Sequence, residues 1–190
     1  MERSALYRRA LAPVMLSAGL IGLATAMVPF FTTIHSNRAF ALFWMAVAVT
    51  ALATAFLLVR RQALREQEPF WSPPTRRVTE ALLPPLLAGG AVGVLLVAYD
   101  HLLRPAAWYT AAAWIILYGC ALNAAGFFTP RGLQLFGRAF VLIGCGLVLV
   151  SPLVPGDPSV AAHCVMGSVF GLLHLAYGIY LYFTERKQSA

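Results

Sequence analysis

The sequence predicts an all-α, polytopic membrane protein: a bundle of six transmembrane helices with both termini in the cytoplasm. Three observations lead to this prediction. First, 60% of the residues are hydrophobic and only 11% are charged, whereas about 25% are charged in an ordinary soluble domain. Second, the apolar residues form six continuous runs of spanning length. Third, the basic residues are divided unevenly between the loops that join these runs.

The six runs are each long enough to cross a bilayer, since about 20 helical residues span about 30 Å of hydrocarbon. None contains Asp, Glu or Lys, and the only Arg is Arg138. Because the runs are continuously apolar, they do not fit the alternating strands of a membrane β-barrel. The predicted spans are 11–33, 39–59, 81–99, 106–128, 136–155 and 159–183, within one domain of residues 1–190.

The first run could also be a signal peptide, because Ala24-Thr25-Ala26 resembles a signal-peptidase site. However, the apolar stretch continues through Phe31, which is longer than the apolar region of about 7–15 residues in a signal peptide. We therefore interpret this run as a retained span.

The basic residues set the orientation. Cytoplasmic loops of membrane proteins carry an excess of Lys and Arg. With the N-terminus inside, only Arg38 and Arg104 fall outside, and the other 12 of the 14 are cytoplasmic. Trp44 and Trp108 near outer span ends and Tyr182 near an inner end agree with the aromatic belts of membrane proteins. The net charge of +7 thus has a topological cause, and nucleic acid is not expected as a partner.

The cytoplasmic loop 60–80 is the longest connection between the spans. It holds two apolar residues, Phe70 and Trp71, close to Arg76 and Arg77. Ser72 followed by Pro73 is a helix start signal for the third span. Two interpretations stay open: an anchor held by lipid headgroups, or a docking site for a cytoplasmic regulatory protein.

The sixth run is the most patterned. His163, Gly167, Gly171, His174 and Gly178 recur at helical spacing, which predicts a single face. Gly167 and Gly171 form a GxxxG pair that permits close helix approach, within one bundle or between chains of a homo-oligomer. The histidines either bond to neighbouring helices or contact a ligand, because polar groups near the bilayer centre are costly.

The candidate ligand-binding residues are His174, Asn123, Gly171 and Tyr177. Asn123 is the one amide inside the predicted hydrocarbon region, and it could equally bond two helices together. No cofactor is predicted. His163 and His174 are eleven residues apart, or about 16 Å along a helix, so they could not hold the same haem iron.

A second candidate site lies at the outer ends of the spans, where His35, His101 and His163 occur with Asp100 and Asp157. Imidazole and carboxylate groups suit Zn²⁺ or a similar divalent ion, and imidazoles could also sense external pH. The alternative is a set of scattered polar residues facing water. The three cysteines show no metal or redox spacing and are interpreted as packing residues.

Several prolines lie within or near the ends of the predicted spans. Pro84-Pro85, Pro29 and Pro152 are expected to kink helices or mark their ends. An enzyme is not predicted, because the chain has no HExxH motif, no phosphate-binding loop and no suitable nucleophile context.

Two stretches, Glu68-Pro-Phe-Trp-Ser-Pro-Pro-Thr-Arg-Arg77 and Gly171-Leu-Leu-His174-Leu-Ala-Tyr-Gly178, carry a resemblance. They resemble an uncharacterised family of small bacterial six-span membrane proteins that are often encoded beside a winged-helix transcription regulator. The resemblance implies a location in the bacterial plasma membrane and favours a sensor or a sequestering partner. It implies no catalytic activity.

Together these observations predict a non-enzymatic membrane binding or sensor protein. It would bind a small or lipophilic ligand within the bundle and dock a cytoplasmic regulatory partner. The alternative is a transporter or channel subunit for a small solute or a metal ion.

Overall fold

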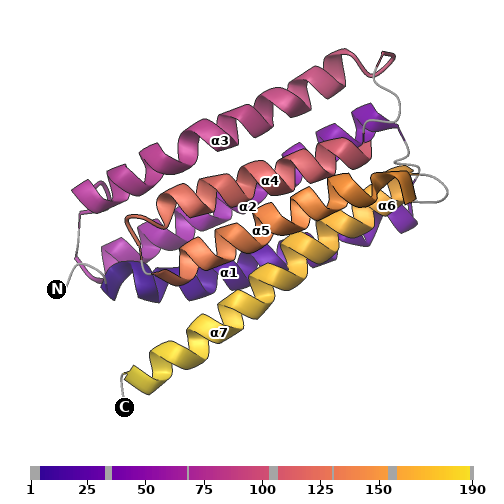
Figure 1. Cartoon of the computed structure of the whole chain (residues 1–190). Helices are drawn as coiled ribbons and strands as arrows, with labels where there is room; N and C mark the ends of the chain where they lie inside the picture. Colours follow the sequence, from indigo (N-terminus) through magenta and orange to yellow (C-terminus); the bar gives the residue numbers. More distant parts are fainter. Residues whose placement is uncertain are drawn as a thin grey trace.

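The computed structural model describes residues 5–32, 36–67, 69–102, 107–129, 131–153 and 158–188. All regular elements in these ranges are helical, which confirms the predicted fold class (Figure 1). The elements are α1 (Ala5–Ala26), η2 (Val28–Phe30), α2 (Asn37–Arg65), α3 (Pro73–Ala98), α4 (Ala107–Ala125), α5 (Arg131–Val150), η3 (Ser151–Leu153), α6 (Pro158–Met166), η4 (Gly167–Leu172) and α7 (Leu173–Gln188). Because η4 is a π-helical turn, α6, η4 and α7 form one continuous helix.

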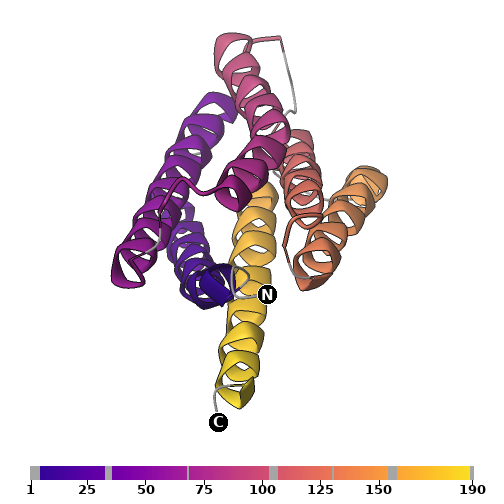
Figure 2. The same cartoon turned by 90° about the vertical axis from the view of Figure 1, so that its left-hand side faces the viewer.

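Successive long helices run in alternating directions along the bundle. As a result, α1 begins and α7 ends at the same end, where α2 is also joined to α3 (Figures 1 and 2). We call this the terminal end of the bundle. Helix α4 packs against α3 and α5, and α1 packs against α2 and α7. α4 has many buried residues, so it forms the centre around which the others are arranged.

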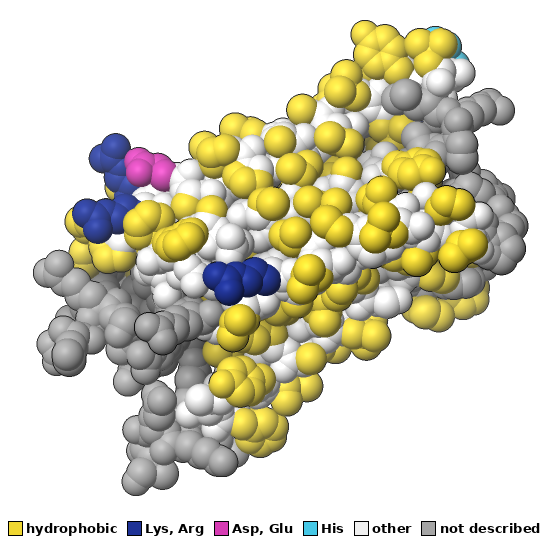
Figure 3. Space-filling model, in the orientation of Figure 1, with side chains coloured by type: hydrophobic (Ala, Val, Ile, Leu, Met, Phe, Trp, Pro, Cys, Tyr) yellow, Lys and Arg dark blue, Asp and Glu magenta, His cyan; other side chains and the backbone are white. Residues whose placement is uncertain are grey.

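The outer surface is that of a membrane protein. Four described stretches are long and apolar enough to cross a bilayer, namely Asn37–Arg65, Pro73–Ala98, Gly132–Leu153 and Ser159–Thr184, and Ala10–Ala26 is a shorter apolar helix. Large apolar side chains point outward from them, with Leu142 73% and Leu149 79% exposed. Figure 3 shows hydrophobic side chains along the whole flank of the bundle. A soluble monomer rarely exposes such a continuous apolar surface.

Charge is concentrated toward the terminal end. Arg38 is described at the start of α2, which lies at the opposite end (Figure 1). The other Lys and Arg side chains that the structure describes belong to the terminal half: Arg60, Arg61, Arg65, Arg76, Arg77 and Arg138. On the face drawn in Figure 3, the Lys and Arg side chains accordingly lie toward the left.

Several helix ends follow the predicted signals, and others do not. Ser72 is the N-cap of α3 and Pro73 its first residue, as predicted. The first predicted span extended to residue 33, but α1 ends at Ala26 and Pro29 lies in the short turn η2. Proline lacks the amide hydrogen that an α-helix requires there. In contrast, Pro84 and Pro85 lie inside α3, which continues through them to Ala98.

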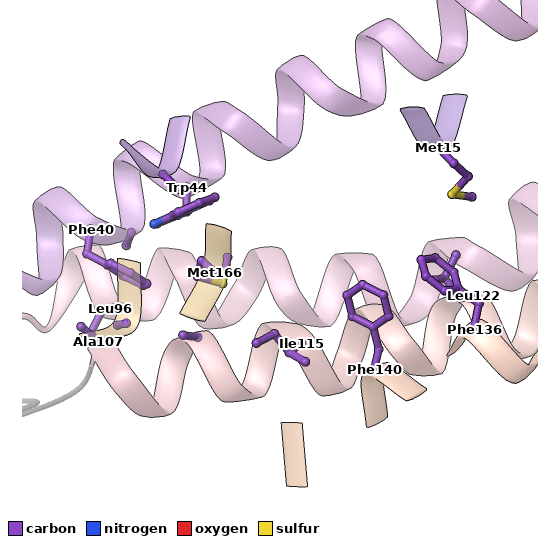
Figure 4. Packing of buried hydrophobic residues seen from close by; sticks show 14 of the residues in the cluster. Met15, Phe40, Trp44, Leu96, Ala107, Ile115, Leu122, Phe136, Phe140 and Met166 are labelled. Carbon is purple, nitrogen blue, oxygen red and sulfur yellow. The ribbon is translucent and has the colours of Figure 1, made fainter. Parts of the chain in front are cut away.

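The buried core runs along the length of the bundle rather than forming one central point. Phe40 and Trp44 lie toward one end of it, and Phe136, Phe140 and Leu122 toward the other (Figure 4). Where α4 meets α5 the backbones nearly touch. A Cβ atom on Gly119 would lie 2.7 Å from the carbonyl oxygen of Gly137, so only glycine fits at this contact.

Candidate functional site

The most unusual polar feature of the core is a hydrogen-bonded pair formed by Tyr118 of α4 and His174 of α7. The Tyr118 hydroxyl lies 2.6 Å from His174 Nε2. His174 is only 2% exposed, and each residue lies close to the middle of its continuous helix. We call these two residues the Tyr118–His174 pair.

The second ring nitrogen of His174 fixes the direction of these bonds. Its Nδ1 lies 2.6 Å from the carbonyl oxygen of Phe170. A carbonyl oxygen only accepts hydrogen bonds, so Nδ1 carries a proton. In the neutral ring, Nε2 therefore accepts the hydroxyl proton of Tyr118. The pair thus forms a chain of two hydrogen bonds that connects α4 to the backbone of η4.

Aromatic rings from α4, α5 and η4 enclose the imidazole. Phe136 and Phe140 contact it edge to face, with ring centroids 5.2 and 5.4 Å from that of His174. Phe170 lies parallel to it at 6.1 Å, and Tyr118 lies at 5.4 Å. The environment of the pair is consequently apolar and filled by side chains.

The π-helical turn η4 comes immediately before this site in the chain. Phe170 of η4 supplies both a ring and a carbonyl oxygen to the site, and this oxygen also accepts the amide hydrogen of Leu173. Single π-turns within α-helices occur frequently at functional sites. The irregular backbone and the buried polar pair therefore lie in one place.

A second buried histidine has a different arrangement. His163 of α6 is 1% exposed, and its Nδ1 accepts the indole N–H of Trp44 of α2 at 2.9 Å. Since an indole nitrogen only donates, this Nδ1 carries no proton. Phe40 and Phe43 pack edge to face on the ring at 4.8 and 5.8 Å. This site joins α6 to α2, whereas the Tyr118–His174 pair joins α7 to α4.

The predicted ligand-binding residues are only partly brought together. Tyr177 stacks on Phe136 at 4.5 Å, so it borders the enclosure of His174. Gly171 instead faces α1, where its Cβ would lie 2.6 Å from the Leu23 side chain. Asn123 contacts α5, with its backbone nitrogen 2.6 Å from a Cβ placed on Gly137, and its buried Oδ1 accepts no hydrogen bond within the described residues.

The expected single face of the sixth run was therefore wrong. Gly167, Gly171 and Gly178 pack against α1, while His163 reaches α2 and His174 reaches α4 and α5. A helix turns about 100° per residue, so residues three or four apart are rotated by about 40–60° around the axis, and the glycines and histidines can contact different neighbouring helices. The GxxxG contact serves inside this bundle.

The predicted outer metal residues do not form a cluster in the described part of the chain. His163 is buried with its Nδ1 lone pair bound to Trp44, whereas His101 is exposed. His35 and Asp157 lie outside the described residues. No group of three or more His, Cys, Asp or Glu side chains that could hold a metal ion occurs among the residues that are described.

The predicted docking residues divide into two kinds. Phe70 packs against Phe56 of α2 with ring centroids 5.1 Å apart, so it holds the α2–α3 connection against the bundle. Trp71 is 59% exposed. Arg76 pairs with Glu80 at 2.7 Å, and Arg77 is exposed. Trp71, Arg76 and Arg77 are therefore the outward-facing members of the set, and Phe70 is the inward-facing one.

The cysteines are not packing residues. Cys120, Cys145 and Cys164 are all free and exposed on the outer surface of the bundle.

Comparison with protein-family models, curated proteins and solved structures gave no match.

Sequence reasoning identified His174 but missed its partners Tyr118, Phe136, Phe140 and Phe170. One signal was present. Tyr118 and His174 lie at similar distances from the predicted inner ends of their spans, at residues 128 and 183. A buried tyrosine hydroxyl requires a hydrogen-bond partner at its own depth, so matching polar groups by depth would have paired them.

Proposed function

We propose that this chain is a membrane binding or sensor protein that takes a small lipophilic ligand into the bundle at the Tyr118–His174 pair. The observation that carries the proposal is a hydrogen-bonded polar pair near the middle of the helices, with His174 buried and Tyr118 partly buried among aromatic rings. Polar groups at membrane depth are costly, and they commonly mark binding sites and pathways. The π-turn beside the pair supports the same assignment.

The chemistry of the pair restricts the ligand. Tyr118 supplies one hydroxyl, and the surrounding surfaces are aromatic faces and edges. A matching ligand has an apolar body and one carbonyl or hydroxyl oxygen that can accept the Tyr118 proton. A charged solute does not fit, because no charged side chain is described around the pair to compensate its desolvation.

Binding would be coupled to helix movement, because side chains fill the site. A ligand that bonds to Tyr118 must replace the bond between Tyr118 and His174, and this bond connects α4 to α7. Ligand occupancy would then change the relation of these two helices. This coupling favours a sensor over a passive binding protein.

The partner would dock on the exposed side of the α2–α3 connection. Trp71 offers a large apolar surface and Arg77 a positive charge, and both residue types are frequent in the energetic centres of interfaces. The excess of Arg at the terminal end supports a cytoplasmic position for this end, in a bacterial plasma membrane. Both termini would then be cytoplasmic.

Ligand binding is tested with the full chain purified in mild detergent. Native mass spectrometry of the wild type is expected to show a co-purifying small molecule, and Tyr118→Phe is expected to lose it because the donor hydroxyl is removed. Tyr109→Phe is the matched control, since Tyr109 lies on the same helix but is 50% exposed and its hydroxyl bonds to Ser151. Equal retention in both variants would disprove a site at the pair.

Partner docking is tested separately by affinity capture from the native membrane. Trp71→Ala is expected to abolish capture of a cytoplasmic protein, while ligand retention is unchanged. Phe70→Ala tests whether this residue contacts the partner or only holds the connection in place, because Phe70 packs inward on Phe56. This variant is expected to lower the stability of the protein and to weaken partner capture less than Trp71→Ala does. Ligand uptake into proteoliposomes that falls in Tyr118→Phe would instead identify a transporter.

A further inference from the structure

Arg138 has an unusual position for a charged residue. It lies on α5, seven residues after the helix begins at Arg131, which is about 10 Å along the axis. Its side chain is exposed, and the neighbouring outward-facing residues are Leu135, 64% exposed, and Leu142, 73% exposed. The Arg138 side chain therefore projects from the lipid-facing side of an apolar helix.

The described part of the protein gives Arg138 no compensating group, since no hydrogen bond or ion pair joins it to any described residue. A charge on the lipid-facing surface is costly unless it reaches the interface or finds a counter-charge. Among the described residues no counter-charge is available, and an anionic group of the surrounding lipid can supply it.

Geometry directs the side chain toward headgroups. Side chains on a helix lean toward its N-terminus, and α5 begins at the terminal end of the bundle (Figure 1). An Arg side chain can bury its methylene groups along apolar surface while its charged group reaches the interface. The guanidinium of Arg138 thus extends from within the apolar belt toward the terminal-end leaflet.

We infer that Arg138 binds the phosphate of an anionic phospholipid, with the acyl chains lying along Leu135 and Leu142. The planar guanidinium can donate two parallel hydrogen bonds to phosphate oxygens. The positive charge of Arg60, Arg61, Arg65 and Arg77 at the same end raises the local concentration of anionic lipid. This lipid site is independent of the ligand proposed for the Tyr118–His174 pair.

The site is tested by native mass spectrometry of the full chain in mild detergent, titrated with phosphatidylglycerol or phosphatidylcholine. In Arg138→Gln, the dissociation constant of the tightest phosphatidylglycerol site is expected to rise about tenfold or more, which corresponds to the loss of a charge-assisted bond. Arg138→Lys keeps the charge without the planar fork, and a smaller rise is expected. Phosphatidylcholine binding is expected to be the same in all variants.

Two controls distinguish a specific lipid site at Arg138 from non-specific electrostatic attraction of anionic lipid. Arg61→Gln removes the same charge at the terminal end, and Arg38→Gln removes it at the opposite end; both side chains are exposed. Each is expected to change phosphatidylglycerol affinity less than twofold. The inference is overturned if either control weakens binding as much as Arg138→Gln, if inorganic phosphate displaces the lipid, or if Arg138→Gln dissociates an oligomer without changing lipid affinity.

Discussion

Each of the two buried histidines satisfies its ring nitrogens in a different way. His174 donates from Nδ1 to a carbonyl, whereas His163 accepts at Nδ1 from Trp44. The Nδ1 atoms of His174 and His163 belong to side chains that are almost fully buried, so water cannot replace a lost partner. Removal of either partner therefore leaves a buried polar group unpaired, which costs about 1–3 kcal/mol.

At this scale we predict that Trp44→Phe lowers the free energy of unfolding by at least about 2 kcal/mol. The change removes the N–H donor to His163 and part of a ring that is only 3% exposed. Trp71→Phe is the control at an exposed tryptophan, with an expected change within about 0.5 kcal/mol. Unfolding in a denaturing detergent titration measures both. Similar losses would show that the Trp44 bond contributes nothing.

The sequence identified these histidines more readily than their surroundings. A histidine inside an apolar run is visible in one segment, so His174 could be selected directly. Its partners lie on two other helices, and their choice depends on which helices pack together and on rotation about each axis. Asn123 illustrates the limit, because it was grouped with His174 but lies where α4 meets α5 at Gly137.

At the scale of the helices, the close contact between α4 and α5 requires glycine, because there is no space for a Cβ atom between the two backbones. We predict that Gly137→Ala destabilises the fold by about 1–3 kcal/mol, because the new Cβ would lie 2.6 Å from the backbone nitrogen of Asn123. Gly146→Ala on the same helix has open space around its Cβ. It is expected to be neutral or to stabilise by up to about 1 kcal/mol.

The same unfolding titration compares these two variants. Both variants introduce one methyl group into α5, so the effect of helix propensity is the same in each. The difference between their free energies of unfolding therefore measures the effect of the close contact between the α4 and α5 backbones. If Gly137→Ala were as stable as Gly146→Ala, the close approach of α4 to α5 would be incorrect.

The sequence predicted a helix boundary correctly where the boundary depends on neighbouring residues alone. Ser72 and Pro73 begin α3 as predicted, because the fixed backbone angle of proline suits the first helical position. The effect of prolines further inside was less predictable, since α3 continues through Pro84 and Pro85. The π-turn was not predicted at all. Gly167 and Gly171 of this turn lie against α1, and the sequence of a single segment does not show which helix it packs against.

For the whole molecule, alternation of the helices places the beginning of α1 and the end of α7 at one end (Figure 1). The tally of basic residues predicted the same relation, because an even number of crossings returns the chain to its starting side. The order in which the helices pack around α4 could not be predicted, since composition does not determine neighbours.

We predict that the terminal end faces the cytoplasm of a bacterial host. A fluorescent protein fused after Ala190 is expected to fluoresce, while alkaline phosphatase fused there is expected to be inactive. Alkaline phosphatase fused after Leu102, between α3 and α4, is expected to be active because that connection lies at the opposite end (Figure 1). The reverse pattern of activities would show that the terminal end faces away from the cytoplasm.

The π-turn η4 also has a mechanical consequence. Helix α7 continues for 16 residues beyond it, or about 24 Å, and its final turns diverge from the other helices (Figures 1 and 2). Any tilt of α7 at η4 would therefore be enlarged along its length. A tilt of about 10° at η4 would move the far end by about 4 Å, so a small change beside His174 would be amplified at the membrane surface.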